Sequence, residues 1–349
     1  MKIRKQHALA FDDVLLVPRY NDIPSRQDPS IDTSVRISSE LTLGIPLISS
    51  PMDTITEDEM AIELARLGGL GIVHRYNTIY DQVVIAKKII QQNARAGFAI
   101  GATGDFMERV SALSNEGADI FCVDVAHGDS QMVIEAVTKI RQAYGLSTII
   151  AGNVASGSAA IKLARAGADA IRIGIGSGSL CSTRIQTGNG IPTLESLIDC
   201  YEQPFGSLKG VCLIADGGIK NSGDCVKSLA SGANAVMLGR LLAGSHCTPG
   251  KAEEVDGRLF KRYRGMASIS AQKDRLHHST KLIVPEGEET LVPFSGLLKD
   301  IVAQLMGGVR SGMTYQGARS FNELRDNAEF VQITNAGLVE SHPHAKHKP

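Results

Sequence analysis

The chain has 349 residues, of which 43% are hydrophobic and 21% charged, and its formal net charge is -1. This composition is that of a globular protein with enough chain for a large core. The near-neutral charge argues against nucleic acid or an anionic membrane surface as the main partner. No apolar run reaches the length of a membrane span, and Asp12 and Asp13 interrupt the N-terminal segment where a signal peptide needs an unbroken hydrophobic stretch.

Short, continuously apolar and β-branched runs recur along the chain and predict strands that are buried on both faces. In chain order they lie at 45–51, 70–74, 97–103, 119–125, 148–154, 170–176, 211–218 and 235–240. Helical spacing appears between them, and many of these segments end in glycine, a usual helix stop; examples are 57–69, 130–145, 157–168 and 222–233. The regular alternation predicts an α/β fold, a (β/α)8 TIM barrel, with 1–349 as one domain. A doubly wound open sheet is the alternative; the strand count, and polar motifs clustered where strands end, favour the barrel.

Two further segments lie outside the repeat. Residues 1–44 precede the first strand, and residues 247–292 follow the eighth. The second segment is polar and long for a structureless connection, so we expect an active-site flap or lid. Residues 294–318 predict a closing helix and turn. The C-terminal tail is 335–349, and its polar end, 340–349, is expected to be mobile unless a neighbouring subunit holds it.

The six cysteines show neither a CxxC pair nor zinc-ligand spacing. Several lie inside apolar runs, for example "IFCVDV" and "VCLIADGG". This pattern indicates reduced, buried thiols in a cytoplasmic protein, with one reactive cysteine at most.

Glycine-rich turns follow three of the late strands. Asp216 is followed by Gly217 and Gly218 in "ADGG", and "MLGR" places Gly239 and Arg240 after the eighth strand. The acid suits a ribose diol, and glycines allow backbone amides to approach a phosphate, a use that this barrel often makes of strands seven and eight. Tight turns alone would also explain the glycines, but two adjacent motifs plus a Gly/Ser loop after strand six favour a phosphate site.

That loop, "GIGSGSLCSTR", contains Cys181. A lone cysteine is usually buried and inert. Here the surrounding segment is too polar and glycine-rich for a core, and Arg184 is near, so Cys181 is a candidate covalent nucleophile. No histidine neighbours it in sequence, and a base would have to come from elsewhere in the fold.

Two other strand ends carry polar residues. "DVAHGDS" ends strand four with Asp124 and His127, and Asn153 ends strand five. His127 either faces a ligand or starts a helix, and Asn153 either contacts a ligand or caps the following helix.

Together these motifs resemble the IMP dehydrogenase/GMP reductase family over nearly the whole chain. The matching stretches are "FDDVLLVP", "SSPMDT", "VDVAHG", "AGNVAS", "GIGSGSLCSTR", "IADGGI", "VMLGRLLAG", "YRGMAS", "KLIVPEG" and "NAGLVESHPH". The resemblance implies the same barrel, usually assembled as a homotetramer. It also implies redox chemistry at purine C2 of a nucleotide monophosphate, IMP or GMP, through a covalent thioimidate on the loop cysteine.

The resemblance also implies roles by position. The catalytic residues would be Cys181, which attacks C2, Thr183, which positions water or ammonia, Arg275 and Glu286. Substrate-binding residues would be Ser50, Met52, Ser179, Asp216, Gly218, Gly239, Arg240, Tyr263, Gly265, Met266 and again Glu286. Asp124, Asn153 and Arg172 would lie toward the cofactor NAD or NADP. K⁺ would be bound by Gly176, Gly178 and Cys181, with Glu340, Ser341 and His342 of a neighbouring subunit.

The direction of the reaction is less evident. Dehydrogenases of the family carry an Arg-Tyr pair on the flap, and here Leu276 follows Arg275. The short flap, "YRGMAS", "MTY" and the absence of a regulatory insertion between strands two and three favour the reductase. Arg275, the "KLIVPEG" run, "IADGGI" and "ESHPH" favour IMP dehydrogenase, which is the preferred interpretation, with GMP reductase as the alternative.

Two other classes of function are open. A non-catalytic nucleotide-binding barrel would leave Cys181 unreactive toward a 6-chloropurine nucleotide. An aldolase-like barrel would need a Schiff-base lysine at a strand end, and "VAHG" and "ADGG" offer none, with Lys220 beyond its turn.

Overall fold

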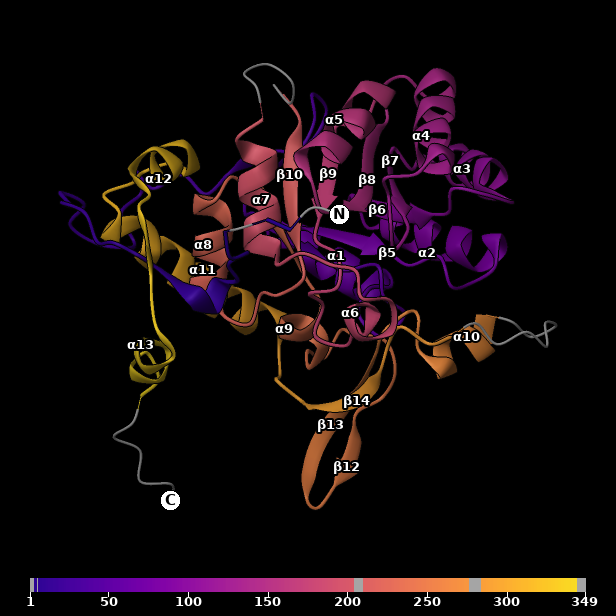
Figure 1. The fold of residues 1–349 in the computed structure, drawn as a ribbon. Coiled ribbons are helices and arrows are strands. Elements are labelled where there is room, and N and C mark those ends of the chain that lie inside the picture. Colours follow the sequence, from indigo (N-terminus) through magenta and orange to yellow (C-terminus); the bar gives the residue numbers. More distant parts are fainter. Residues whose placement is uncertain (1–2, 5, 204–209, 276–283, 344–349) are drawn as a thin grey trace.

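The computed structural model describes residues 3–4, 6–203, 210–275 and 284–343. Its centre is a closed barrel of eight parallel strands in the order β10-β11-β4-β5-β6-β7-β8-β9 (Figure 1). The strands are β4 (Leu47–Ser49), β5 (Leu70–Val73), β6 (Ala96–Ile100), β7 (Ile120–Asp124), β8 (Thr148–Val154), β9 (Ala170–Ile173), β10 (Cys212–Asp216) and β11 (Ala235–Leu238). Seven of them lie within the predicted runs, and β6 begins one residue before its run, at Ala96, so the barrel prediction is confirmed.

Helices follow the strands and surround the barrel (Figure 1). They are α1 (Asp58–Arg66), α2 (Ile79–Gln91), α3 (Phe106–Asn115), α4 (Gln131–Ala143), α5 (Gly157–Ala166), α7 (Thr193–Tyr201), α8 (Ser222–Ala230), α9 (Arg240–Ala243) and α11 (Leu298–Tyr315). Local signals set their ends. The Ser156 hydroxyl accepts the Ala159 N–H at the start of α5, and Gly167 ends that helix in the left-handed conformation at φ +111°.

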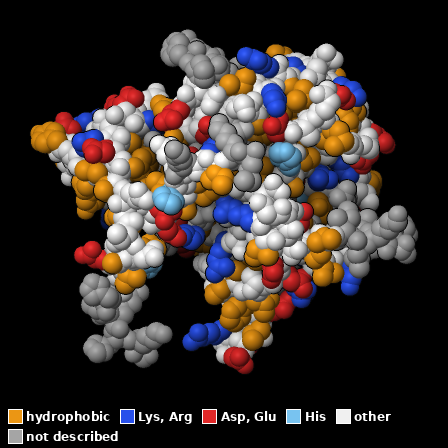
Figure 2. Space-filling model, in the orientation of Figure 1, with side chains coloured by type: hydrophobic (Ala, Val, Ile, Leu, Met, Phe, Trp, Pro, Cys, Tyr) orange, Lys and Arg blue, Asp and Glu red, His pale blue; other side chains and the backbone are white. Residues whose placement is uncertain are grey.

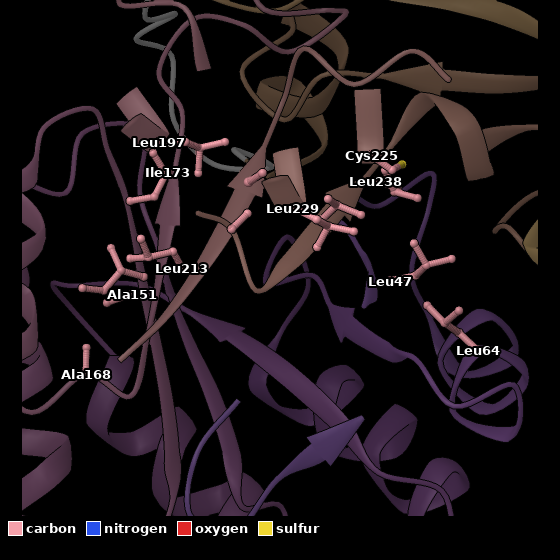
Figure 3. Packing of buried hydrophobic residues seen from close by; sticks show 14 of the residues in the cluster. Leu47, Leu64, Ala151, Ala168, Ile173, Leu197, Leu213, Cys225, Leu229 and Leu238 are labelled. Atoms are coloured by element: carbon pink, nitrogen blue, oxygen red, sulfur yellow. The ribbon is translucent and has the colours of Figure 1, made fainter. Parts of the chain in front are cut away.

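The alternation of side chains along the strands divides the core into two layers. Outward-facing strand residues, such as Leu47 and Leu213, pack in one cluster with helix residues such as Leu64 and Leu197 (Figure 3). Inward residues fill the barrel with a second cluster, which includes Ile48, Ile72, Ile120, Ile150 and Ile214. Both faces of each strand are therefore apolar, which is why the strands read as unbroken hydrophobic runs.

The N-terminal end of the barrel is plugged by a hairpin. It consists of β2 (Val35–Arg36) and β3 (Thr42–Leu43), whose buried side chains join the interior cluster. Ser38 lies within 2.7 Å of the hydroxyl of Thr148 at the start of β8. A binding site is therefore expected at the opposite end of the barrel, where the strands finish.

The segment 247–292 has secondary structure of its own. β12 (Glu253–Val255), β13 (Arg258–Arg264) and β14 (Glu289–Pro293) form an antiparallel sheet that projects from the barrel, with α10 (Ile269–Arg275) beside it (Figure 1). Exposed Val255, Leu259 and Leu291 lie on this sheet, and Figure 2 shows hydrophobic side chains on the projection. Elsewhere on that face, positive and negative side chains are interspersed, consistent with the near-zero net charge (Figure 2).

Strands from the N-terminal and C-terminal parts of the chain pair beside the barrel. The 3-10 helix η1 (Phe11–Asp13) leads into β1 (Val14–Leu16), which pairs antiparallel with β15 (Phe330–Gln332) after α12 (Phe321–Asn327). The tail then begins as a helix, α13 (Asn335–Glu340), because the Thr334 hydroxyl accepts the Gly337 N–H. The helix covers the start of the tail, the mobility expected of 340–349 stays a prediction, and 344–349 lie outside the described residues.

Two glycines in α11 predict opposite stability effects for one substitution. A Cβ at Gly312 would lie 2.6 Å from the Val226 Cγ2 atom of α8, whereas at Gly307 it would meet nothing within 4 Å. We expect Gly312→Ala to destabilise the fold by about 1–3 kcal/mol through overpacking. Gly307→Ala should stabilise it by about 0.5–1 kcal/mol, because alanine has the higher helix propensity. Thermal unfolding of the two variants measures this, and shifts of the same sign would contradict the packing of α11 on α8.

Candidate active site

A cavity of about 530 Å³ opens at the carboxyl ends of the barrel strands. Loop residues after β4, β9, β10 and β11 line it, together with residues from the segment 247–292. Every substrate-binding residue expected from the sequence lies in its wall, with two of the expected potassium-site glycines: Ser50, Met52, Gly176, Gly178, Ser179, Asp216, Gly218, Gly239, Arg240, Tyr263, Gly265, Met266 and Glu286. The fold therefore collects into one cavity residues that are up to 236 positions apart, from Ser50 to Glu286.

Cys181 and Thr183 also line this cavity and are hydrogen-bonded in series to Glu286. The Cys181 thiol lies 3.1 Å from the Thr183 hydroxyl, to which it donates, and that hydroxyl donates to the Glu286 carboxylate over 2.7 Å. The backbones of Cys181 and Gly287 form an isolated antiparallel β-bridge, and the Ser182 N–H donates to the Glu286 carbonyl over 2.9 Å. These backbone contacts hold the two loops together. The arrangement offers a path for a proton between a sulfur and a carboxylate.

Another set of lining residues suits an anion. Ser179 and the buried Tyr263 lie with their hydroxyls 3.0 Å apart, and Arg240 supplies a positive charge at the start of α9. Burial raises the pKa of the Tyr263 phenol, so it stays a neutral hydrogen-bond donor. Gly218 adopts φ +82°, which a residue with a side chain rarely does, and this turn presents backbone at the cavity wall. Hydroxyls, backbone and one guanidinium form a donor set for phosphate.

Asp124, Asn153 and Arg172 do not line this cavity. Asn153 and Arg172 bind Asp216, which does line it, and Asp124 binds Arg172. Arg172 lies between Asp124, at 2.5 Å, and Asp216, at 2.8 Å, while Asn153 donates to Asp216 over 2.8 Å. Burial alone would lower the pKa of Arg172, but the Asp216 and Asp124 carboxylates raise it well above its ordinary range. The guanidinium is therefore charged, and both carboxylates are held by it.

A second cavity, of about 790 Å³, opens beside the first at the ends of β5, β6 and β7. Ala126 lines the first cavity, whereas its neighbours Val125 and His127 line the second, so the two are adjacent. The second cavity also contains Arg75 and Asn77, and the Asn77 Nδ2 atom is buried without a hydrogen-bond partner among the described residues.

For the two strand-end residues with open interpretations, these contacts exclude the helix-start and helix-cap alternatives. His127 faces a cavity and does not start a helix, since α4 begins at Gln131 after Ser130. Asn153 does not cap a helix either, because Ser156 caps α5 and the Asn153 amide binds Asp216 and the Gly174 carbonyl.

Some expected residues are not brought into the cavity. Arg275 ends α10, but its side chain and residues 276–283, with Leu276, lie outside the described part of the chain. Glu340, Ser341 and His342 belong to the end of α13, which packs against η1 and lies apart from the Cys181 loop (Figure 1).

Sequence reasoning missed one wall of the cavity. Phe11 and Asp12 of η1 line it together with Lys220, which pairs with Asp12. The only signal was the opposite charge of two residues that are 208 positions apart, and no local pattern joins them.

The part of the chain that the structure describes contains no helix long and apolar enough to cross a membrane.

Comparison with known proteins gives one consistent result. Residues 8–344 match the family model of the IMP dehydrogenase/GMP reductase domain. The chain is 37% identical to the inosine-5'-monophosphate dehydrogenase of Borreliella burgdorferi, with 98% of each chain covered. It is 34% identical to the protein of that name from Nitrosopumilus maritimus (97% of this chain and 98% of the relative) and 35% identical to that from Bacillus subtilis (97% and 96%). The last two alignments extend over 472 positions, so these relatives contain residues that this chain lacks.

Proposed function

Since the chain belongs to the IMP dehydrogenase/GMP reductase family, we propose that it is an oxidoreductase that converts IMP, NAD⁺ and water to XMP and NADH. Near-full-length similarity to proteins named inosine-5'-monophosphate dehydrogenase supports this direction. The observation that carries the chemistry is the hydrogen-bonded series Cys181–Thr183–Glu286 in a cavity that also contains a donor set suited to phosphate.

In the proposed reaction the nucleotide phosphate binds near Ser179, Tyr263 and Arg240, and Asp216 accepts hydrogen bonds from the ribose. The purine then extends toward Cys181, and Met52 and Met266 line the same cavity. The Cys181 sulfur adds to C2, and its proton passes through the Thr183 hydroxyl toward Glu286. After oxidation of C2, the same hydroxyl positions water for hydrolysis of the thioimidate, and Arg275 serves as a base on the flap formed by 247–292.

NAD⁺, when bound, accepts the hydride that leaves C2. The residues present fit such a dinucleotide. The second cavity adjoins the first at Ala126, its volume lies in the usual range for ligand sites, and the unpaired Asn77 amide faces no protein acceptor. We assign the half of the dinucleotide remote from the nicotinamide to this cavity.

We further propose a homotetramer with K⁺ at the Cys181 loop. The carbonyls of Gly176, Gly178 and Cys181 are the oxygen donors that a hard cation takes, but three carbonyls do not complete a coordination shell. Residues 340–342 of the same chain lie at α13 beside η1, and a neighbouring chain is needed to supply them. Free cysteines, five of them buried, support a cytoplasmic location. We propose neither nucleic acid nor a membrane as a partner.

The test is a pair of spectroscopic assays of the purified protein. We expect nicotinamide absorbance at 340 nm to rise with IMP and NAD⁺ and to stay flat with GMP and NADPH. GMP reductase is the second candidate because Leu276 follows Arg275 where dehydrogenases carry tyrosine. A fall in absorbance with GMP and NADPH, and no change with IMP and either NAD⁺ or NADP⁺, would assign the chain to the reductases.

A further inference from the structure

The two carboxylate oxygens of Asp216 have very different surroundings. Oδ2 accepts hydrogen bonds from Asn153 Nδ2 at 2.8 Å, from Arg172 Nε at 3.1 Å and from Arg172 Nη2 at 2.8 Å. No hydrogen bond from the described residues reaches Oδ1. Because Asp216 lines the cavity, its saturated oxygen points into the protein and its free oxygen is the one available to a ligand.

The two residues that hold Asp216 are themselves fixed. Arg172 is buried, and its Nη1 donates to Asp124 Oδ1 over 2.5 Å, so both edges of the guanidinium are engaged. The Asn153 amide donates its other hydrogen to the Gly174 carbonyl over 2.8 Å. A Cβ on Gly152 would lie 2.6 Å from the Arg172 Cβ atom, and only glycine lets the two strands bring this arginine so close. Asp216 therefore has little rotational freedom.

We propose that Arg172 and Asn153 are positioning residues that aim the free oxygen of Asp216 at the ribose 2′- and 3′-hydroxyls, and thereby set a preference for ribonucleotides over 2′-deoxyribonucleotides. This inference rests on the proposed function for the identity of the ligand. A carboxylate oxygen placed for two hydroxyls loses a donor when the 2′-hydroxyl is absent, and a partly buried acceptor without a donor is costly. Without the clamp Asp216 can turn away, and the two nucleotides become more alike.

The clamp makes a different prediction from direct contact with the dinucleotide. If Arg172 and Asn153 act through Asp216, their replacement changes the ratio of kcat/KM for IMP to that for 2′-deoxy-IMP and leaves the KM for NAD⁺ nearly unchanged. If they bind the dinucleotide, the KM for NAD⁺ rises and the ratio is constant. A purely structural role lowers all rates together.

The experiment compares Arg172→Lys, Asn153→Ala and a matched control, Arg141→Lys. Lysine keeps the charge but cannot make the forked contact to two carboxylates, so the protein avoids an uncompensated buried charge. Arg141 makes a comparable ion pair with Asp169, at 2.5 Å, next to the start of β9 and away from the cavity. We expect the IMP/deoxy-IMP ratio to fall by about tenfold in the first two variants, the size of one hydrogen bond to a charged group, and to be unchanged in Arg141→Lys.

Binding without turnover separates this inference from the proposed reaction. Dissociation constants for IMP and 2′-deoxy-IMP, and for GMP and 2′-deoxy-GMP, are measured by calorimetry with no cofactor present. A reductase would still show the loss of ribose discrimination in the two variants, and the inference would hold. An unchanged ratio in both Arg172→Lys and Asn153→Ala, for both purines, would overturn it.

Discussion

Cys181→Ala will reduce turnover of IMP with NAD⁺ by more than about 10³-fold, because no other group near C2 can form the covalent intermediate. Alanine removes the sulfur and leaves the phosphate-side contacts of Ser179, Tyr263 and Arg240 in place. The dissociation constant for IMP, measured by calorimetry, should therefore change by less than about threefold. A variant that keeps more than a tenth of wild-type kcat would contradict covalent catalysis.

The same cysteine can be distinguished chemically from the others. Cys181 is exposed, and the other five cysteines are buried. Burial raises the pKa of the Cys247 thiol to about 11 and that of the other four to about 12: Cys122, Cys200, Cys212 and Cys225. Since the thiolate is the nucleophile, iodoacetamide at neutral pH should add one group per folded chain. Intact-mass spectrometry should show protection by IMP and no adduct in Cys181→Ala; alkylation of a buried cysteine at a similar rate would be inconsistent with this packing.

Glu286→Gln will lower kcat by about 10²- to 10³-fold, the usual contribution of a proton-transferring group. Glutamine has nearly the same shape and can still accept the Thr183 hydrogen bond, but it cannot take up a proton. The effect should therefore fall on kcat, with the KM for IMP changed by less than about threefold. A raised KM with a normal kcat would instead mean that Glu286 only binds the purine.

Two further variants sharpen that prediction. Glu288→Gln makes the same chemical change two residues away on an exposed side chain that does not line the cavity, and its kcat should equal that of the wild type. Thr183→Val breaks the series between Cys181 and Glu286. If the three groups act as one relay, the Thr183→Val, Glu286→Gln double variant will be no slower than the worse single variant; additive losses would argue for separate roles.

The sequence indicated the barrel because strands buried on both faces must be apolar throughout. Ile48 and Leu47 show the reason, since adjacent residues of β4 enter the interior and the outer layer respectively. Most predicted runs were longer than the strands: β9, for example, ends at Ile173, whereas the apolar run continues to Gly176. Apolar composition alone does not mark the residue at which a strand leaves the barrel.

The same reasoning located the polar residues at strand ends, but it did not predict which of these residues contact one another. Asp216 and Arg172 were expected in separate roles, as ribose and cofactor ligands, yet they form one ion pair. The Thr183–Glu286 contact joins residues 103 positions apart through a segment whose course no local pattern reveals. Long-range partners depend on how loops fold over the barrel mouth, and that depends on tertiary packing.

Because a hairpin plugs the N-terminal end of the barrel, that end is structural and the other end carries the cavity. Val35, Ile37 and Leu43 fill the N-terminal end of the barrel with apolar side chains, while Cys181, Thr183 and Glu286 line the cavity at the other end. Heat resistance can therefore be tuned at the N-terminal end while the reaction keeps its speed. In the proposed reaction, nucleotide and dinucleotide both bind at the mouth, so a compound bound across the two cavities there would block substrate entry and product exit together.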